Sequence, residues 1–127
     1  MEQKIKFEQE YIVNASLSVM YPMLSTPSGL SEWFSDDVNI NGKIFTFFWD
    51  GTGQEAELVA KRTNVFARFR WLDDDDPKAY FEFKLTTDEL TNEVALVITD
   101  FAEADEIDDS RELWDTQVDK LKHNLGL

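Results

Sequence analysis

Residues 107–125 have the sequence IDDSRELWDTQVDKLKHNL and carry a periodic stripe of apolar side chains. The stripe consists of Ile107, Trp114, Val118, Leu121 and Leu125, which follow one another at steps of seven, four, three and four residues. Because an α-helix has about 3.6 residues per turn, these steps return to one face, and the pattern predicts an amphipathic helix. We expect this face to pack against the rest of the chain.

Polar residues mark both ends of this helix. Asp109 followed by Glu112 resembles a capping box with Asp in the Ser/Thr position, so we expect the helix to begin near Asp108 or Asp109. Gly126 is a suitable C-terminal cap. His123, the only histidine, is expected to be exposed near that end, and a single histidine gives no basis for a Ser-His-Asp triad.

The segments before this helix alternate apolar and polar residues with period two, which is typical of half-buried β-strands. Six strands are predicted, over Lys4–Val13, Lys43–Trp49, Gln54–Arg62, Val65–Leu72, Ala79–Leu85 and Asn92–Phe101. Short turns such as Asp50-Gly51-Thr52-Gly53 and Thr63-Asn64 separate the last five, so neighbours in sequence are expected to pair antiparallel.

The region between the first two strands predicts two short helices, over about Val19–Leu24 and Pro27–Phe34, the second with Thr26 as its N-cap. Val38–Ile40 then precedes Asn41-Gly42, a pair that often marks a tight hairpin. The run before this pair is only three residues long, so a bend or bulge leading into one strand is an equal alternative.

The order of these elements predicts an α+β fold. A six-stranded antiparallel sheet twists and curls, and the long C-terminal helix can bury its stripe by lying across the concave face. A chain of 127 residues is expected to form a single domain over residues 1–127. Such a layout often encloses a cavity between helix and sheet.

The composition excludes several classes of function. The net charge of −14 argues against nucleic acid as a partner, because phosphate binding needs a basic surface, and against an anionic membrane surface. The chain has no cysteine, so disulfides, thiolate catalysis and cysteine-based zinc sites are excluded. No apolar run approaches membrane-spanning length, so we expect no membrane insertion and a cytoplasmic protein.

No metal ion or cofactor is predicted. The acidic run Asp73–Asp76 lacks the spacing of an EF-hand calcium loop, and Pro77 follows it directly, so a solvated turn is expected. Asp36 and Asp37 are neighbours in sequence and are expected to point apart rather than form a catalytic pair. No catalytic residue is therefore assigned.

Three stretches carry a resemblance to a known family. They are LSEWF at Leu30–Phe34, VNINGKIF at Val38–Phe45 and LWDTQVDKL at Leu113–Leu121. With the order of elements above, they resemble the START-like or SRPBCC superfamily, which has the helix-grip fold. The chain is most similar to the branch that resembles the activator of heat-shock-chaperone ATPase.

This resemblance implies a hydrophobic cavity between the terminal helix and the sheet. Many members use that cavity for lipids, polyketides, hormones or other apolar molecules, so the first expectation is a domain that binds a small hydrophobic ligand, lipid-like or aromatic. The alternative is a protein-interaction module similar to chaperone-activator domains, or a homodimer. The third is an enzyme similar to polyketide cyclases, for which the sequence offers few candidate groups.

The expected cavity lining is mainly aromatic, as in most ligand pockets. The candidates are Trp33, Phe34, Phe45, Phe47, Trp49, Phe69, Trp71, Phe81, Phe83, Trp114 and Val118. The same residues could equally form a closed core. Among polar residues, Tyr11 is inward by alternation, and Arg62 and Asp100 share parity with inward residues, as a ligand-orienting pair or as exposed strand ends.

Phe66, Arg68 and Arg70 share the face of their strand that is expected to point away from the core. The alternatives are a protein contact, since aromatics and Arg are enriched at interfaces, or pairing with acidic residues such as Glu82 on neighbouring strands.

Overall fold

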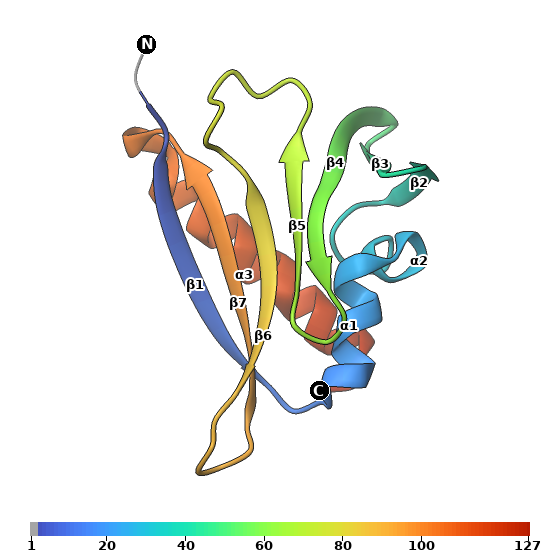
Figure 1. Cartoon of the computed structure of the whole chain (residues 1–127), viewed down its shortest axis with the longest axis vertical. Helices are drawn as coiled ribbons and strands as arrows, with labels where there is room; N and C mark the ends of the chain where they lie inside the picture. Colours follow the sequence, from blue (N-terminus) through green and yellow to red (C-terminus); the bar gives the residue numbers. More distant parts are fainter. Residues whose placement is uncertain (1–2) are drawn as a thin grey trace.

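The computed structural model describes residues 3–127, which form one sheet, two short helices and one long helix (Figure 1). In chain order the elements are β1 Ile5–Val13, α1 Leu17–Ser25, α2 Pro27–Leu30, β2 Asp37–Asn41, β3 Ile44–Trp49, β4 Thr52–Arg62, β5 Phe66–Trp71, β6 Phe81–Thr87, β7 Val94–Ala102, a 3₁₀ turn Ala104–Glu106, and α3 Ile107–Asn124. Among the described residues, no helix is long and apolar enough to cross a bilayer. The α+β class is confirmed.

The sheet has seven strands in the order β1-β7-β6-β5-β4-β3-β2, all antiparallel, so the prediction of six strands was wrong. The additional strand is β2, which pairs with β3 from Asp37↔Phe48 to Asn41↔Ile44. The turn between them places Gly42 at φ 62°, the position that a type II′ hairpin reserves for glycine. The short run before Asn41 is therefore the first arm of a hairpin.

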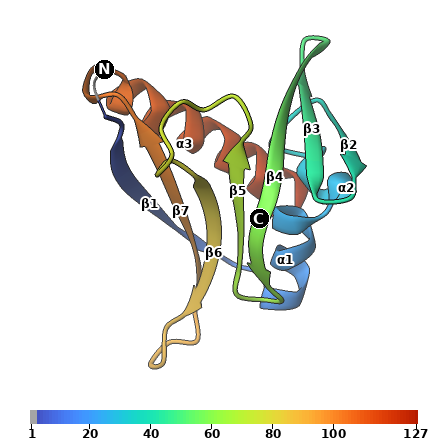
Figure 2. The same ribbon diagram turned by 45° about the horizontal axis from the view of Figure 1, so that its top comes forward.

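Helix α3 lies across one face of the sheet, as Figures 1 and 2 show from two directions. Trp114, Val118 and Leu121 of the predicted stripe are buried beneath it. The predicted capping box is absent, because the helix begins at Ile107 after the 3₁₀ turn and its N-cap residue Glu106 makes no side-chain cap. Asp108 and Asp109 lie instead in the first turn, where they complement the helix dipole.

The end of α3 is closed by Gly126 at φ 74°, as predicted. The N–H of Gly126 donates to the carbonyl of His123, and the N–H of Leu127 donates to the carbonyl of Lys122. These two bonds form a Schellman motif and satisfy carbonyls that the helix itself leaves free.

The two short helices pack against each other, with α2 beside β2 and α1 against β5 and β6 (Figure 2). Ser16 caps α1, which is longer than predicted, and Thr26 caps α2 by accepting from the N–H of Gly29 at 3.0 Å. A Cβ on Gly29 would lie 2.1 Å from the carbonyl oxygen of Pro22, so only glycine permits this approach. Helix α2 ends at Leu30, earlier than predicted, and the following residues form turns.

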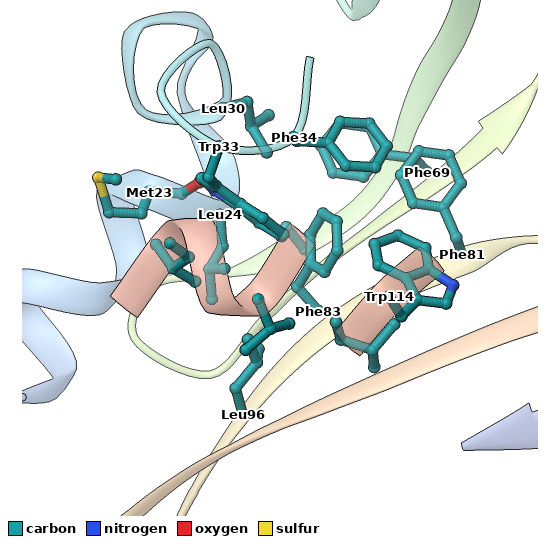
Figure 3. Packing of buried hydrophobic residues seen from close by; sticks show 14 of the residues in the cluster. Met23, Leu24, Leu30, Trp33, Phe34, Phe69, Phe81, Phe83, Leu96 and Trp114 are labelled. Atoms are coloured by element: carbon teal, nitrogen blue, oxygen red, sulfur yellow. The ribbon is translucent and has the colours of Figure 1, made fainter. Parts of the chain in front are cut away.

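The core between α3 and the sheet is filled with aromatic rings (Figure 3). Phe34 lies at its centre, with ring centroids 4.9 Å from Phe47, 5.6 Å from Phe81 and 5.7 Å from Trp114. The indole N–H of Trp33 donates to the carbonyl of Met23 at 2.7 Å and ties this cluster to α1. Rings at these separations are in contact with one another, so they occupy most of the space between α3 and the sheet.

Candidate functional site

Most of the predicted lining residues are packed in this core. Nine of the eleven are buried: Trp33, Phe34, Phe45, Phe47, Phe69, Phe81, Phe83, Trp114 and Val118. The other two, Trp49 and Trp71, are half-buried at its edge. The filled interior matches the alternative of a closed core over most of the region between helix and sheet.

A recess of about 140 Å³ remains where the N-terminal half of α3 crosses the sheet. Its lining residues are Phe34, Trp49, Trp71, Phe81, Asp100, Ser110, Leu113, Trp114 and Gln117. The structure thus brings five of the eleven predicted aromatic and apolar candidates together at one opening. The remaining candidates pack behind these five and do not line the recess.

The walls of the recess are a connected set of rings. The Trp71 ring lies 4.9 Å from Phe81 and 6.1 Å from Trp49, measured between centroids. On the other side, Phe34 stacks on Trp114 with an interplanar angle of 13°. These rings belong to β3, β5, β6, α3 and the turn after α2, so their positions are fixed by the main elements of the fold.

Asp100, near the end of β7, supplies the acidic group of the recess. Its carboxylate accepts the indole N–H of Trp114 at 3.0 Å and the backbone N–H of Phe101 at 2.7 Å. Burial raises the pKa of Asp100 to about 6, although these two hydrogen bonds act in the opposite direction. The expectation of an exposed strand end was wrong for this residue, which is half-buried.

Arg62 does not accompany Asp100. A β-bulge lies between Leu58 and Ala60 of β4, and beyond it Arg62 pairs with Phe66, on the face opposite the core. A bulge inserts one residue and reverses the side to which later side chains point, so the parity argument fails for Arg62. Arg62 is exposed and takes no part in the recess.

Tyr11 also lies outside the recess. Its hydroxyl donates to the carboxylate of Asp115 at 2.6 Å, and Gln9 donates to the same carboxylate at 2.9 Å. Burial, and then the hydrogen bond to Asp115, raise the pKa of Tyr11, so the hydroxyl stays protonated and continues to donate. Tyr11 therefore attaches β1 to α3 and is not among the residues that line the recess.

Three residues of the recess were missed by the sequence analysis: Ser110, Leu113 and Gln117. They lie one helical turn apart along α3, beside the apolar stripe. Leu113, which is 59% exposed, stands at the rim. The helical spacing could have identified this row, but only the position of β5 and β6 shows that it faces a recess.

A larger cavity of about 480 Å³ lies under the acidic loop between β5 and β6. Its lining residues are Gln3, Lys4, Gln54, Trp71, Asp73, Asp74, Asp75, Asp76, Pro77, Lys78 and Glu103. The guanidinium of Arg70 donates to three backbone carbonyls of the loop, and the ammonium of Lys4 lies 3.0 Å from the Asp74 carboxylate. The loop is thus built from internal contacts. Trp71 borders both this cavity and the recess.

Arg68 pairs with an acidic residue on the neighbouring strand, which was one of the two expectations for it. Its guanidinium lies 2.7 Å from the carboxylate of Glu82 on β6 and over the ring of Tyr80.

A family model described as a START-like superfamily domain matches residues 1–127. Among solved structures, BfR322 from Bacteroides fragilis is 43% identical, with 99% of this chain and 94% of that chain covered and a TM-score of 0.69. The Aha1 dimer from Colwellia psychrerythraea is 20% identical, with 93% of each chain covered and a TM-score of 0.76. DynU16, from the dynemicin biosynthetic locus, is 17% identical, with 95% of this chain and 47% of that chain covered and a TM-score of 0.79.

The comparison with curated proteins gave no match. The Colwellia protein and DynU16, both under 25% identical, support the fold alone. The family model spans every residue, and its fold is the one described above, with a curved antiparallel sheet and a long C-terminal helix. The chain belongs to the START-like superfamily.

Proposed function

We propose that this chain binds a small apolar molecule, of about the size of one aromatic ring, in the recess between α3 and the sheet. The observation that carries the proposal is an opening of about 140 Å³ walled by the rings of Phe34, Trp49, Trp71, Phe81 and Trp114. An apolar cavity of about 150 Å³ is large enough to hold benzene. Membership of the START-like superfamily supports a binding or interaction role in general terms.

The size of the recess limits the ligand. Pockets for drug-sized molecules measure about 300–1,000 Å³, well above the volume found here. The space behind the recess is filled by buried rings such as Phe47 and Phe83. A single ring, or the end of a longer molecule whose remainder stays outside, fits better than an enclosed fatty acid.

The binding energy would come from burying apolar surface of the ligand and apolar surface of the recess walls. Each Å² of apolar surface removed from water contributes about 25 cal/mol. Leu113 at the rim would become more buried over a bound ring, because more than half of this residue is exposed without one.

The proposed unit is the single domain of residues 1–127, and the proposed setting is the cytoplasm, because a chain without cysteines needs no oxidising compartment.

The test is a titration with single-ring compounds and with fatty acids, followed by tryptophan fluorescence, since three of the lining residues are tryptophans. Ser110→Leu should fill the recess and abolish the response. Thr116→Leu is the matched control, because Thr116 is an exposed residue of α3 that does not line the recess. A response that survives Ser110→Leu, or no response to any compound, would refute the proposal.

A second candidate is a homodimer formed through an edge strand. Strands β1 and β2 are the two edges of the sheet, and each exposes isoleucine: Ile5 47% and Ile12 46% on β1, and Ile40 51% on β2. Edge strands offer unpaired backbone groups to a second chain, and the similar Colwellia protein is described as a dimer. Sedimentation equilibrium tests this candidate: a mass of one chain at every concentration removes it.

A further inference from the structure

We propose that the ligand of the recess is an aromatic cation, a single ring that carries a protonated amine or amidine, with Asp100 as its counter-ion. This inference rests on the proposed function and narrows it to one chemical class.

Three side-chain N–H groups at the recess donate to acceptors within the protein. The indole N–H of Trp49 and the side-chain amide of Gln117 both donate to the carbonyl of Phe34 at 3.0 Å. The indole N–H of Trp114 donates to Asp100.

The acceptors that remain for a ligand include the side-chain amide oxygen of Gln117 and the carboxylate of Asp100. Within residues 3–127 the Trp71 indole N–H and the Ser110 hydroxyl also make no hydrogen bond, so two neutral donors remain beside them. Asp100 is the one charged group among these, so a ligand that donates to its carboxylate gains the strongest hydrogen bond.

Asp100 has capacity for a further partner. An ionised carboxylate offers about four acceptor positions. Two of them are taken by the N–H groups of Trp114 and Phe101. A ligand ammonium or amidinium group would add a charge-assisted hydrogen bond, which is about twice as strong as a neutral one.

The aromatic walls favour the same charge. The face of an aromatic ring is electronegative and attracts a cation within about 6 Å of its centroid, and indole does so most strongly. Trp49, Trp71 and Trp114 all line the recess, together with two phenylalanines. An anionic ligand in the recess would be repelled by the Asp100 carboxylate.

No lysine, arginine or histidine is among the residues that line the recess within the described part of the chain. The charged groups that act on Asp100 from nearby segments are Lys4, just before β1, and Asp74, in the loop before β6. The Lys4 ammonium is already paired with Asp74 at 3.0 Å. Helix α3 and β6 contribute neutral side chains to the recess, so nothing on its lining neutralises Asp100. The net charge of −14 would also steer cations towards the molecule.

The geometry implies a pH dependence. Without ligand the pKa of Asp100 is raised to about 6 by burial. A bound cation stabilises the carboxylate and lowers that pKa, so the affinity should be constant above pH 7 and fall below pH 6. Between pH 7.5 and pH 5 we expect the affinity for the cation to fall about tenfold. One unit below the pKa, Asp100 is ionised in only about a tenth of the molecules.

The experiment compares ligands of nearly the same shape on the full chain by calorimetry: benzylamine, benzyl alcohol, toluene and benzoate. Benzylamine should bind at least about tenfold more tightly than the neutral compounds at pH 7.5, and benzoate most weakly. At pH 5 the advantage of benzylamine should shrink. Asp100→Asn, checked for folding by circular dichroism, should remove the advantage of benzylamine over toluene.

The outcomes separate this inference from the function on which it rests. If toluene or benzyl alcohol binds as tightly as benzylamine, the cation class is wrong and the ring-binding recess stands. If none of the four binds, the proposed function fails and this inference fails with it. The comparison of ligands on the unchanged protein decides the matter even if the Asp100→Asn variant does not fold.

Discussion

Asp100 combines a structural and a chemical role at one position. Its carboxylate holds the Trp114 indole at 3.0 Å, which fixes one wall of the recess. The same burial that makes this contact possible raises the pKa of the carboxyl group to about 6. Between about pH 4 and pH 6, Asp100 therefore keeps its proton in the folded protein. In the unfolded chain, where its pKa is about 3.9, it has lost that proton.

This difference predicts a pH-dependent stability. Between pH 4 and pH 6 the native state binds more protons at Asp100 than the unfolded state does, so the stability that Asp100 contributes falls as pH rises, and it is constant above about pH 6. Measured by urea denaturation, the unfolding free energy of the wild type minus that of Asp100→Asn should decrease by about 1–2 kcal/mol across this window, a discounted value because Asp100 is only half-buried.

Subtracting the variant removes the contributions of other carboxylates. Backbone N–H groups lower the pKa values of Asp76 and Asp88, so these two act in the opposite direction, but they are present in both proteins. A difference that stays flat or increases from pH 4 to pH 6 would contradict the burial of Asp100.

Gly29 is the position where a single methyl group should do most harm. Its Cβ would lie 2.1 Å from the Pro22 carbonyl oxygen and 2.6 Å from the Met23 Cα, and both atoms belong to the backbone of α1. Gly29→Ala should therefore lower the unfolding free energy by about 2–3 kcal/mol, the range for overpacking at a rigid site. The exposed neighbour Ser28→Ala is the control and should change the midpoint of urea denaturation little. Equal midpoints for the two variants would show that the helices can separate.

At the scale of elements, the attachment of α3 to β1 depends on a polar cluster beside the recess. The Asp115 carboxylate accepts from both Tyr11 and Gln9, and the Arg111 guanidinium donates to the side-chain amide oxygen of Gln9 at 2.6 Å. Tyr11→Phe removes one member and leaves the ring in place. We expect a loss of about 1 kcal/mol in unfolding free energy, as for a typical hydrogen bond. An unchanged denaturation midpoint would mean that water replaces the hydroxyl at no cost.

The elements also show what the sequence could predict. The stripe from Ile107 to Leu121 follows one period for several turns, so the helix and its buried face followed directly from spacing. The bulge of β4 could not be predicted from spacing. In the sequence, Ala60 continues the apolar and polar alternation of the strand, but the backbone register shifts between Leu58 and Ala60. Strand β2 depended on a hairpin signal attached to a very short run, for which pattern alone could not separate a strand from a bend.

At the scale of the molecule, composition indicated an aromatic interior but not its volume. Whether the ten aromatic side chains of the candidate lining form a closed core or leave a cavity depends on small differences in packing. A pattern of residue types does not determine such differences. The position of Asp100 illustrates this: parity placed it on the inner face, and only the neighbouring Trp114 and Phe81 make it part of a recess. The sequence could therefore predict that the lining is aromatic, but it identified only some of the residues that form it.

The charge of the whole chain predicts a response to salt. With 26 acidic and 12 basic residues, the compact state is destabilised by self-repulsion. Raising NaCl from about 0.01 M to about 1 M shortens the Debye length from about 30 Å to about 3 Å and should raise the melting temperature. Calorimetry at several salt concentrations checks this, and a fall in melting temperature would mean that ion pairs such as Arg68–Glu82 outweigh the repulsion.

The most direct measurement for the central claim is to locate a bound ring by NMR, through nuclear Overhauser effects between benzylamine protons and the protein. The recess predicts contacts to the indole protons of Trp49, Trp71 and Trp114 and to the methyl groups of Leu113. Contacts confined to the acidic loop or to the outer face of the sheet would contradict it.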